Sequence, residues 1–243
     1  MRSCIRLLYI PLALALAAPG ARAQTAPSVD ALYADRGNLA SARRAADIWA
    51  MQLGANPKDF EAAWKLARAD YWLGGHTQES EQRAFYESGV DAGDKAIAID
   101  SARPDGHFWK AANMGALAES FGLRAGLKYR KPIKEELETV LKIDPAFRDG
   151  SADRALGRWY AKVPGLFGGS DKEAEAHYQA SLKYKADSTV THYFLAELYA
   201  DKGRKAEAKA ECQKVLDAPI TTEWGPEDRE WKAKATRLLA SLK

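Results

Sequence analysis

Apolar residues in most of this chain recur three and four positions apart, which is the spacing of one face of an α-helix. The segments AAWKLARADYWLG (residues 62–74) and GHFWKAANMGALAESFG (residues 106–122) both show this spacing. Glycine and proline interrupt the pattern at intervals, where helices are expected to end. We therefore predict a mostly helical protein without a sheet of three or more strands.

The helical pattern repeats along the chain. LYADRGNLASARRAADIW (residues 32–49) resembles LYADKGRKAEAKAECQKV (residues 198–215), with the same first four residues and a glycine two positions later. A third copy aligns Leu156-Gly157 with Leu195-Ala196. Its Ala174 and Tyr178 recur 34 residues later as Ala208 and Cys212. A small residue on a first helix and Ala-x-x-x-aromatic on a second, 34 residues apart, is the tetratricopeptide spacing.

The small residues have a physical role, because two antiparallel helices approach closely only where their crossing lacks bulk. One helix pair cannot bury its apolar face alone, so several pairs must stack. The sequence thus predicts an all-α, tetratricopeptide-type helical-hairpin repeat solenoid with a C-terminal capping helix. The expected pairs cover residues 28–54 (turning at Gly37), 58–99, 105–143, 150–184 and 188–217, and the capping helix begins near Pro226.

The first residues have the layout of a secretory signal peptide. A basic start (MRSCIR) precedes the apolar run LLYIPLALALAA, and small residues follow at Ala21 and Ala23. The alternative is a membrane anchor, but the run has 12 residues and a span takes ~20. We predict a signal peptide over residues 1–23, a repeat domain over residues 24–243 and a periplasmic location. Cys4 precedes the apolar run, so no lipoprotein acylation site is visible.

Cleavage would remove three arginines, and with them the whole formal net charge of +3. A protein that neutralises phosphates needs a basic excess, so we predict that this protein does not bind nucleic acid. The four histidines form no close ligand pair, and there is no G-x-S-x-G elbow. We expect no catalytic residue, metal or cofactor, and we interpret Cys212 as a small buried thiol.

The segment WYAKVPGLFGGSDKE (residues 159–173) raises two alternatives. Glycines before a helix can cradle phosphate, but neither a phosphate-loop nor a dinucleotide-loop pattern is present and no strand precedes it. Leu156 and Leu195 are 39 residues apart, so this repeat carries extra residues between its helices. We interpret the segment as a connector closed by a capping box at Ser170–Glu173. Leu166 and Phe167 either fold back onto the core or protrude into a neighbouring chain.

First helices of such repeats line a concave surface, where aromatic residues between cations suit a ligand with an apolar body and a carboxylate. The alternative is that Trp64 and Tyr71 belong to the core and the cations are solvated. The predicted groove residues are Trp64, Arg68, Tyr71, Trp72, His107, Lys110, Met114, Arg154, Arg158, Tyr193 and Glu197.

The segments LGRWYAKVPGLFGGSDKEAEAHYQASLKY and STVTHYFLAELYADKGRKAEA resemble the T component of TRAP transporters. A weaker likeness, through HFWKA and LGRWY, is to the regulator of microtubule dynamics family; the export signal argues against that intracellular role. The first resemblance implies a non-catalytic periplasmic protein, trimeric, with a pore or groove for an organic or hydrophobic ligand and a solute-binding protein as partner. The chain departs from many members in lacking a lipoprotein cysteine.

Two function classes follow. One is an exported accessory component that acts with a periplasmic solute-binding protein of a TRAP-type transporter and handles an organic or hydrophobic ligand. The other is a general tetratricopeptide-repeat scaffold for protein or peptide partners in the cell envelope.

Overall fold

A computed structural model describes residues 27–242, so the expected signal peptide lies outside the described residues. The described chain forms α-helices and one short 3-10 helix, and it contains no strand. The helices are α1 (Val29–Ala34), α2 (Leu39–Ala55), α3 (Phe60–His76), α4 (Glu79–Ile99), α5 (Pro104–Ser120), α6 (Gly122–Ile143), α7 (Phe147–Lys162), η1 (Gly165–Phe167), α8 (Asp171–Leu182), α9 (Thr189–Asp201), α10 (Lys205–Asp217) and α11 (Gly225–Ser241).

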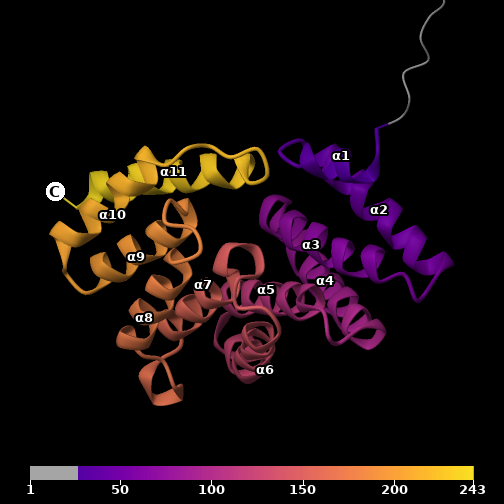
Figure 1. Cartoon of the computed structure of the whole chain (residues 1–243), viewed down its shortest axis with the longest axis horizontal. Helices are drawn as coiled ribbons and strands as arrows, with labels where there is room; N and C mark the ends of the chain where they lie inside the picture. The colour runs from indigo at the N-terminus through magenta and orange to yellow at the C-terminus, as the bar shows by residue number, and fades with distance from the viewer. Residues whose placement is uncertain (1–26, 243) are drawn as a thin grey trace, which may run out of the picture.

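The helices stack as five successive antiparallel pairs followed by α11, which confirms the predicted repeat solenoid. Figure 1 shows that the pairs follow a curved path, so that α11 returns to lie beside α1. Local sequence chemistry sets where the helices begin. Asp59 and Ser188, for example, accept hydrogen bonds from backbone N–H groups in the first turns of α3 and α9. No helix in the described part of the chain has both the length and the apolar character needed to cross a membrane.

Close helix crossings occur at glycines, as the repeat pattern predicts. A Cβ atom on Gly157 would lie 2.6 Å from the ring of Tyr178, so this crossing tolerates no side chain. The second repeat has the same arrangement, because a Cβ on Gly74 would lie 2.4 Å from Tyr86. Gly89 is equally tight against Asn113 of α5, at 2.3 Å. The sequence pattern alone did not identify the crossings at Gly74 and Gly89.

The segment between α7 and α8 is a tight connector. Gly168 has a φ of 103°, which glycine adopts without strain. A Cβ on Gly169 would lie 1.6 Å from the carbonyl oxygen of Val163. Ser170 then caps α8 by accepting a hydrogen bond from the backbone N–H of Glu173 at 3.2 Å. Leu166 extends into solvent, with 90% of its surface exposed, and so does not fold back onto the core.

The start of α7 departs from a regular helix. Arg148, Asp149 and Gly150 all have positive φ values, of 45°, 59° and 71°. Two consecutive non-glycine residues in this region are costly, and such residues persist only where the surrounding structure holds them. The regular part of α7 therefore begins after Gly150, and the preceding turn directs Arg148 among four aromatic rings. These rings belong to Trp64, Trp109, Phe147 and Trp224.

Candidate ligand-binding interior

Tyr71 on α3 marks a recessed surface inside the curve of the solenoid. Its side chain is 41% exposed, yet the surrounding protein raises its pKa by desolvation. Glu119 on α5 and Arg154 and Arg158 on α7 act electrostatically on the same phenol. A side chain that water reaches, but that charges on other helices surround, lines a recess rather than the outer face. We call Tyr71, Glu119, Arg154, Arg158, Tyr193 and Glu197 together the interior surface.

Arg154 is the cation of this surface that lacks a partner. It makes no hydrogen bond and no ion pair within the described residues, and its side chain is only partly exposed. Burial lowers its pKa to about 10, and the charges of Asp149 and Tyr71 only partly offset this effect. A guanidinium in a recess without a counter-ion is costly, and a bound carboxylate would lower that cost by pairing with it.

Arg158, one helical turn away, is in the opposite situation. Its Nε and Nη2 donate to both carboxylate oxygens of Glu119 at 3.0 and 2.8 Å, and its Nη1 donates to Glu197. Burial opposes its charge, but the hydrogen bonds to Glu119 outweigh burial and raise the pKa of Arg158. Lys162 also pairs with Glu197, at 3.1 Å. Arg158 is therefore neutralised by this protein's own carboxylates and is a poor site for an external anion.

Aromatic rings flank these charges. Tyr71 lies 5.8 Å from Trp109, and Tyr193 lies 5.2 Å from Trp231 on α11, both measured between ring centroids. The guanidinium of Arg158 also lies 4.8 Å from the ring of Phe194. An apolar ligand body would find flat aromatic contacts next to the unpaired guanidinium of Arg154.

A second group of cations lies among aromatic side chains of the first three repeats. The guanidinium of Arg68 is 4.0 Å from the ring of Tyr33 and 4.9 Å from that of Trp64, and Arg148 lies 5.4 Å from the same indole of Trp64. The Nε atoms of both arginines and the indole nitrogen of Trp109 are buried without a hydrogen-bond partner. Burial lowers the pKa of Arg68, and the charge of Arg148 adds to this effect.

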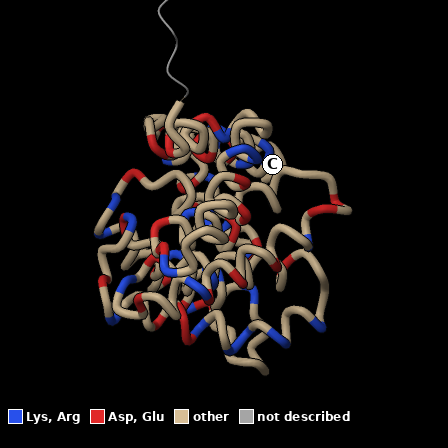
Figure 2. Tube along the Cα trace, turned by 90° about the vertical axis from the view of Figure 1, so that its right-hand side faces the viewer, with Lys and Arg blue, Asp and Glu red and all other residues tan. Residues whose placement is uncertain are grey.

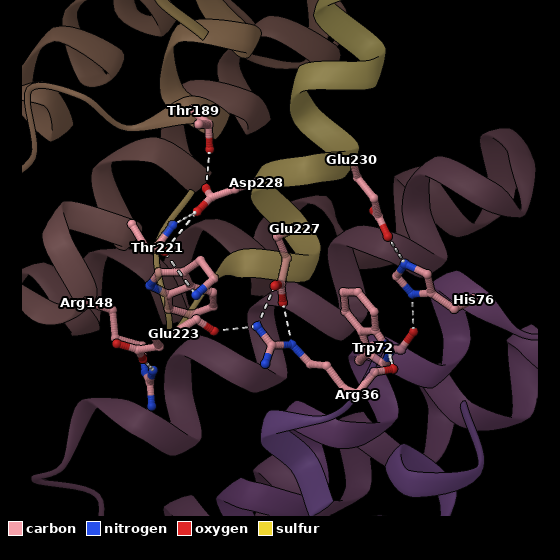
Figure 3. Close-up of polar contacts among 11 residues, drawn as sticks. Arg36, Trp72, His76, Arg148, Thr189, Thr221, Glu223, Glu227, Asp228 and Glu230 are labelled. Carbon is pink, nitrogen blue, oxygen red and sulfur yellow. Dashed lines mark hydrogen bonds and ion pairs between the residues drawn. The ribbon is translucent and has the colours of Figure 1, made fainter. Parts of the chain in front are cut away.

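The two ends of the solenoid are joined by side chains, as Figure 3 shows. Arg36, between α1 and α2, is 3% exposed and donates from Nε to Glu227 of α11 at 2.8 Å. Its Nη2 donates to the other carboxylate oxygen of Glu227 and to the backbone carbonyl of Glu223 at 2.6 Å. The backbone carbonyl of Arg36 in turn accepts from the indole of Trp72 at 2.9 Å. We call these contacts and that of His76 with Glu230 the clasp.

His76 extends the clasp from α3 to α11. Its ring stacks on Trp72 with centroids 3.6 Å apart, and its Nδ1 lies 2.7 Å from the carbonyl of that residue. Its Nε2 lies 2.6 Å from Glu230. Burial lowers the pKa of His76, but the hydrogen bonds to Glu230 and to the Trp72 carbonyl more than reverse this, so the pKa is raised. A cleft of about 580 Å³ opens beside this junction, lined by Gly37, Leu39, Trp72, His76, Pro226, Arg229 and Glu230.

Asp228 holds the start of α11 in place. Its carboxylate accepts from the hydroxyl of Thr189 at 2.7 Å, and from the backbone N–H and hydroxyl of Thr221 at 2.9 and 2.8 Å (Figure 3). The segment between α10 and α11 is thereby fixed to the first turn of α9. Because α11 otherwise packs on α9 and α10, it meets the N-terminal repeats mainly through the clasp.

The predicted groove residues divide into four groups. Met114, Trp64 and Trp72 are 2%, 6% and 4% exposed and belong to the core, so they are not groove-lining residues. Lys110 pairs with Asp94 and Glu136, each at 2.7 Å, and His107 is bound to Glu136. Tyr71, Arg154, Arg158, Tyr193 and Glu197 come together on the interior surface, whereas Arg68 lies with Arg148 in the second cation group.

The histidines are used in packing, as the sequence indicated for His177 and His192. His107 contacts Glu136 at 2.5 Å and His192 contacts Glu211 at 2.6 Å, and the other ring nitrogen of each lies near a backbone carbonyl. His177 lies 2.8 Å from Asp153. Among the described residues no group of His, Cys, Asp and Glu side chains is arranged to hold a metal ion. Cys212 is buried, as predicted.

Two known protein families match large parts of this chain. Residues 27–167 match the family described as regulator of microtubule dynamics protein 1-3, and residues 105–240 match the family described as TRAP transporter T-component. The chain belongs to the helical-repeat families that these two matches describe. The microtubule-regulator likeness, which the sequence motifs indicated as the weaker one, covers a stretch of comparable length.

Individual relatives agree with this placement. Regulator of microtubule dynamics protein 1 of Pongo abelii is 23% identical over 203 residues, which are 76% of this chain and 63% of that protein. Regulator of microtubule dynamics protein 2 of Rattus norvegicus is 25% identical over 203 residues, 76% of this chain and 48% of that protein. The chain thus spans about half to just under two thirds of the length of these curated relatives.

The fold is also similar to that of a solved structure. A thermophilic TPR protein of Thermus thermophilus superposes with a TM-score of 0.64 and 22% sequence identity, covering 85% of this chain and 94% of that one. At this identity the likeness shows the fold alone, a tetratricopeptide-like helical scaffold.

Proposed function

We propose that this chain is an exported, non-catalytic binding protein whose interior surface holds an organic ligand with an apolar body and one carboxylate. In this proposal Arg154 pairs with the carboxylate, and Tyr71, Tyr193 and Trp231 contact the apolar body. Arg158 positions the neighbouring side chains of Glu119 and Glu197 and does not bind the ligand itself. The fold is a protein-binding scaffold in many settings, and a curved interior lined by first helices suits such a ligand.

The observation that carries the proposal is the contrast between Arg154 and Arg158. Both lie on one face of α7. Among the described residues two carboxylates form ion pairs with Arg158, whereas none pairs with Arg154, on which Asp149 acts only through its charge. A protein that needed both arginines only for solubility would leave them on the outer face. An unpaired guanidinium in a recess, beside an accessible tyrosine, is arranged for an anion from outside the chain.

We further propose that the protein works in the periplasm as an accessory component of a TRAP-type transporter, with a solute-binding protein as its partner. The match of residues 105–240 to the T-component family supports this role. The second candidate is a scaffold for protein or peptide partners in the cell envelope. The open cleft of about 580 Å³ beside the clasp favours it, because an extended segment of a partner has room to lie there.

Native mass spectrometry of the secreted chain distinguishes the two candidates. The ligand proposal predicts a co-purifying mass, in the range of a small organic acid, that disappears in the Arg154→Gln variant. A bare monomer that also fails to bind added dodecanoate, but captures peptides of the envelope, would contradict the ligand proposal and support the scaffold.

A further inference from the structure

The start of α6 carries an exposed face that no other helix covers in the part of the chain that the structure describes. Leu123 is 72% exposed and Leu127 is 42% exposed. They are four residues apart on one helix, so they project from the same side. The buried residues of α6, Ile133, Leu137 and Val140, lie further along the helix. The exposed leucines therefore belong to a part of α6 that contributes little to the core.

The connector between α7 and α8 adjoins this face. The ring of Phe167, 37% exposed, lies 5.0 Å from the guanidinium of Arg130, which is one turn beyond Leu127. The indole nitrogen of Trp159 donates to the backbone carbonyl of Arg130 at 2.7 Å, which fixes α6 against the end of α7. Leu166, next to Phe167, is 90% exposed at the tip of the connector. The apolar side chains of α6 and of the connector thus lie on one surface.

The first half of α6 carries positive charge only. From Gly122 to Lys134 the sequence GLRAGLKYRKPIK contains five cations and no acidic residue. Arg124, Lys128 and Lys131 form a stripe next to the leucines, and all three are exposed. Lys131 has a loose pair with Glu135 at 3.5 Å, which is itself solvent-exposed. Figure 2 shows Lys and Arg residues along the lower edge of the molecule, the end at which α6 lies in Figure 1.

We propose that this face, formed by Leu123, Leu127, Leu166 and Phe167 with Arg124, Lys128, Arg130 and Lys131, docks on an anionic lipid surface. A basic stripe next to exposed leucines on an amphipathic helix is the chemistry of interfacial membrane binding. The cations contact lipid headgroups, and the leucine and phenylalanine side chains enter the boundary of the acyl chains.

The shape of the face favours a membrane over an acidic protein. Its most exposed apolar residue, Leu166, protrudes from a loop tip instead of lining a hollow, so it needs a soft partner that can be penetrated. An acidic protein would have to match the spacing of the cations, whereas a lipid surface presents anionic charge at any spacing. Docking of this kind would place a chain without a visible acylation site at a membrane of the cell envelope.

Flotation of the secreted chain with vesicles tests the proposal. We expect the protein to float with vesicles that contain phosphatidylglycerol and not with vesicles of phosphatidylcholine alone, and high salt should release it because salt screens the headgroup charge. The triple variant Arg124→Glu/Lys128→Glu/Lys131→Glu should lower vesicle affinity about tenfold or more. The control Arg44→Glu/Lys58→Glu/Lys95→Glu changes the net charge equally at exposed positions elsewhere and should stay within about twofold.

The apolar part is tested separately with Leu123→Ser/Leu166→Ser and the control Met51→Ser, which alters a residue that is 74% exposed on α2. We expect about a fivefold or larger loss of affinity for the double variant and almost none for the control. Three results would overturn the proposal: no flotation of the wild-type chain, equal losses in the variants and their controls, or equally strong binding to soluble polyglutamate. It would also be overturned if the leucine substitutions dissociated a soluble oligomer while flotation was unchanged, because the face would then join copies of the chain.

Discussion

The guanidinium of Arg36 and the carboxylate of Glu227 form a two-pronged ion pair across 191 residues of sequence. This pair joins the first turn of the solenoid to its last helix, although α11 packs mainly on α9 and α10. The solenoid is therefore closed by side chains rather than by an extended helix contact.

Removing the cation of the clasp should cost much of the protein's stability. In Arg36→Met the aliphatic stem is kept, but Glu227 and the carbonyl of Glu223 lose their donors. Breaking a mostly buried pair from one side costs about 3–5 kcal/mol, and we expect a loss of this order in chemical denaturation. Arg43→Met removes an exposed pair with Glu81 and should cost less than about 1 kcal/mol. Equal effects of the two substitutions would show that the clasp does not close the solenoid.

Stability should fall as the pH rises through the raised pKa of His76. A group whose pKa is higher in the folded state stabilises the fold below its unfolded value, here about 6.5, and this contribution disappears above the folded pKa. The groups that face His76 are Glu230 and Glu227 of α11 and the carbonyl of Trp72. Melting temperatures should be measured upward from about pH 6, which lies just below the unperturbed pKa of histidine. They should decline in the wild type and decline less in His76→Gln. Parallel profiles for both proteins would contradict this assignment.

The crossing of α7 and α8 should not accept even a methyl group. In Gly157→Ala the new Cβ would lie 2.6 Å from the ring of Tyr178, and overpacking of this kind costs about 1–3 kcal/mol. A Cβ on Gly115, within α5, would have no atom within 4 Å, so Gly115→Ala should be neutral or stabilise by up to about 1 kcal/mol through helix propensity. Urea denaturation of the two variants measures this difference. A stable Gly157→Ala protein would mean that these helices are further apart.

Much of the fold was predictable from the sequence because the repeat is local. The expected pair at residues 58–99, for example, corresponds to α3 and α4, and the expected turn at Gly37 separates α1 from α2. The close crossing at Gly74 and Tyr86 could also have been predicted from the sequence, because Leu73-Gly74 is the same dipeptide as Leu156-Gly157. It was missed because that repeat matched the template loosely elsewhere.

The candidate site was only partly predictable, because its properties depend on contacts between distant residues. Arg154 and Arg158 are equivalent in the helical pattern. Among the described residues, Glu119 and Glu197 on two other helices pair with Arg158, whereas no carboxylate pairs with Arg154. The clasp has no local sequence signal at all. Met114 and Trp64 are buried because α3 and α5 pack side by side. The spacing of apolar residues within one helix does not show which other helix it packs against.

The export prediction rests on the sequence alone. We expect the secreted product to begin at Gln24 and to carry no lipid, because the apolar run is short and Cys4 precedes it. Intact-mass measurement of the protein purified from the periplasm of an expression host determines both. Retention of residues 1–23, or an added acyl mass, would contradict the prediction.

The affinity of the Arg154→Gln variant for dodecanoate, measured by isothermal titration calorimetry beside the wild type, tests the ligand proposal most directly. The unpaired guanidinium should contribute roughly 1.5–3 kcal/mol through a charge-assisted hydrogen bond, so the substitution should weaken binding about tenfold or more. Folding should be unchanged, because Arg154 makes no ion pair within the described residues. Arg44→Gln, at an exposed position on α2, should bind as the wild type does. Equal affinities of the wild type and Arg154→Gln would show that the ligand's carboxylate does not meet Arg154, and would contradict the proposed interior site.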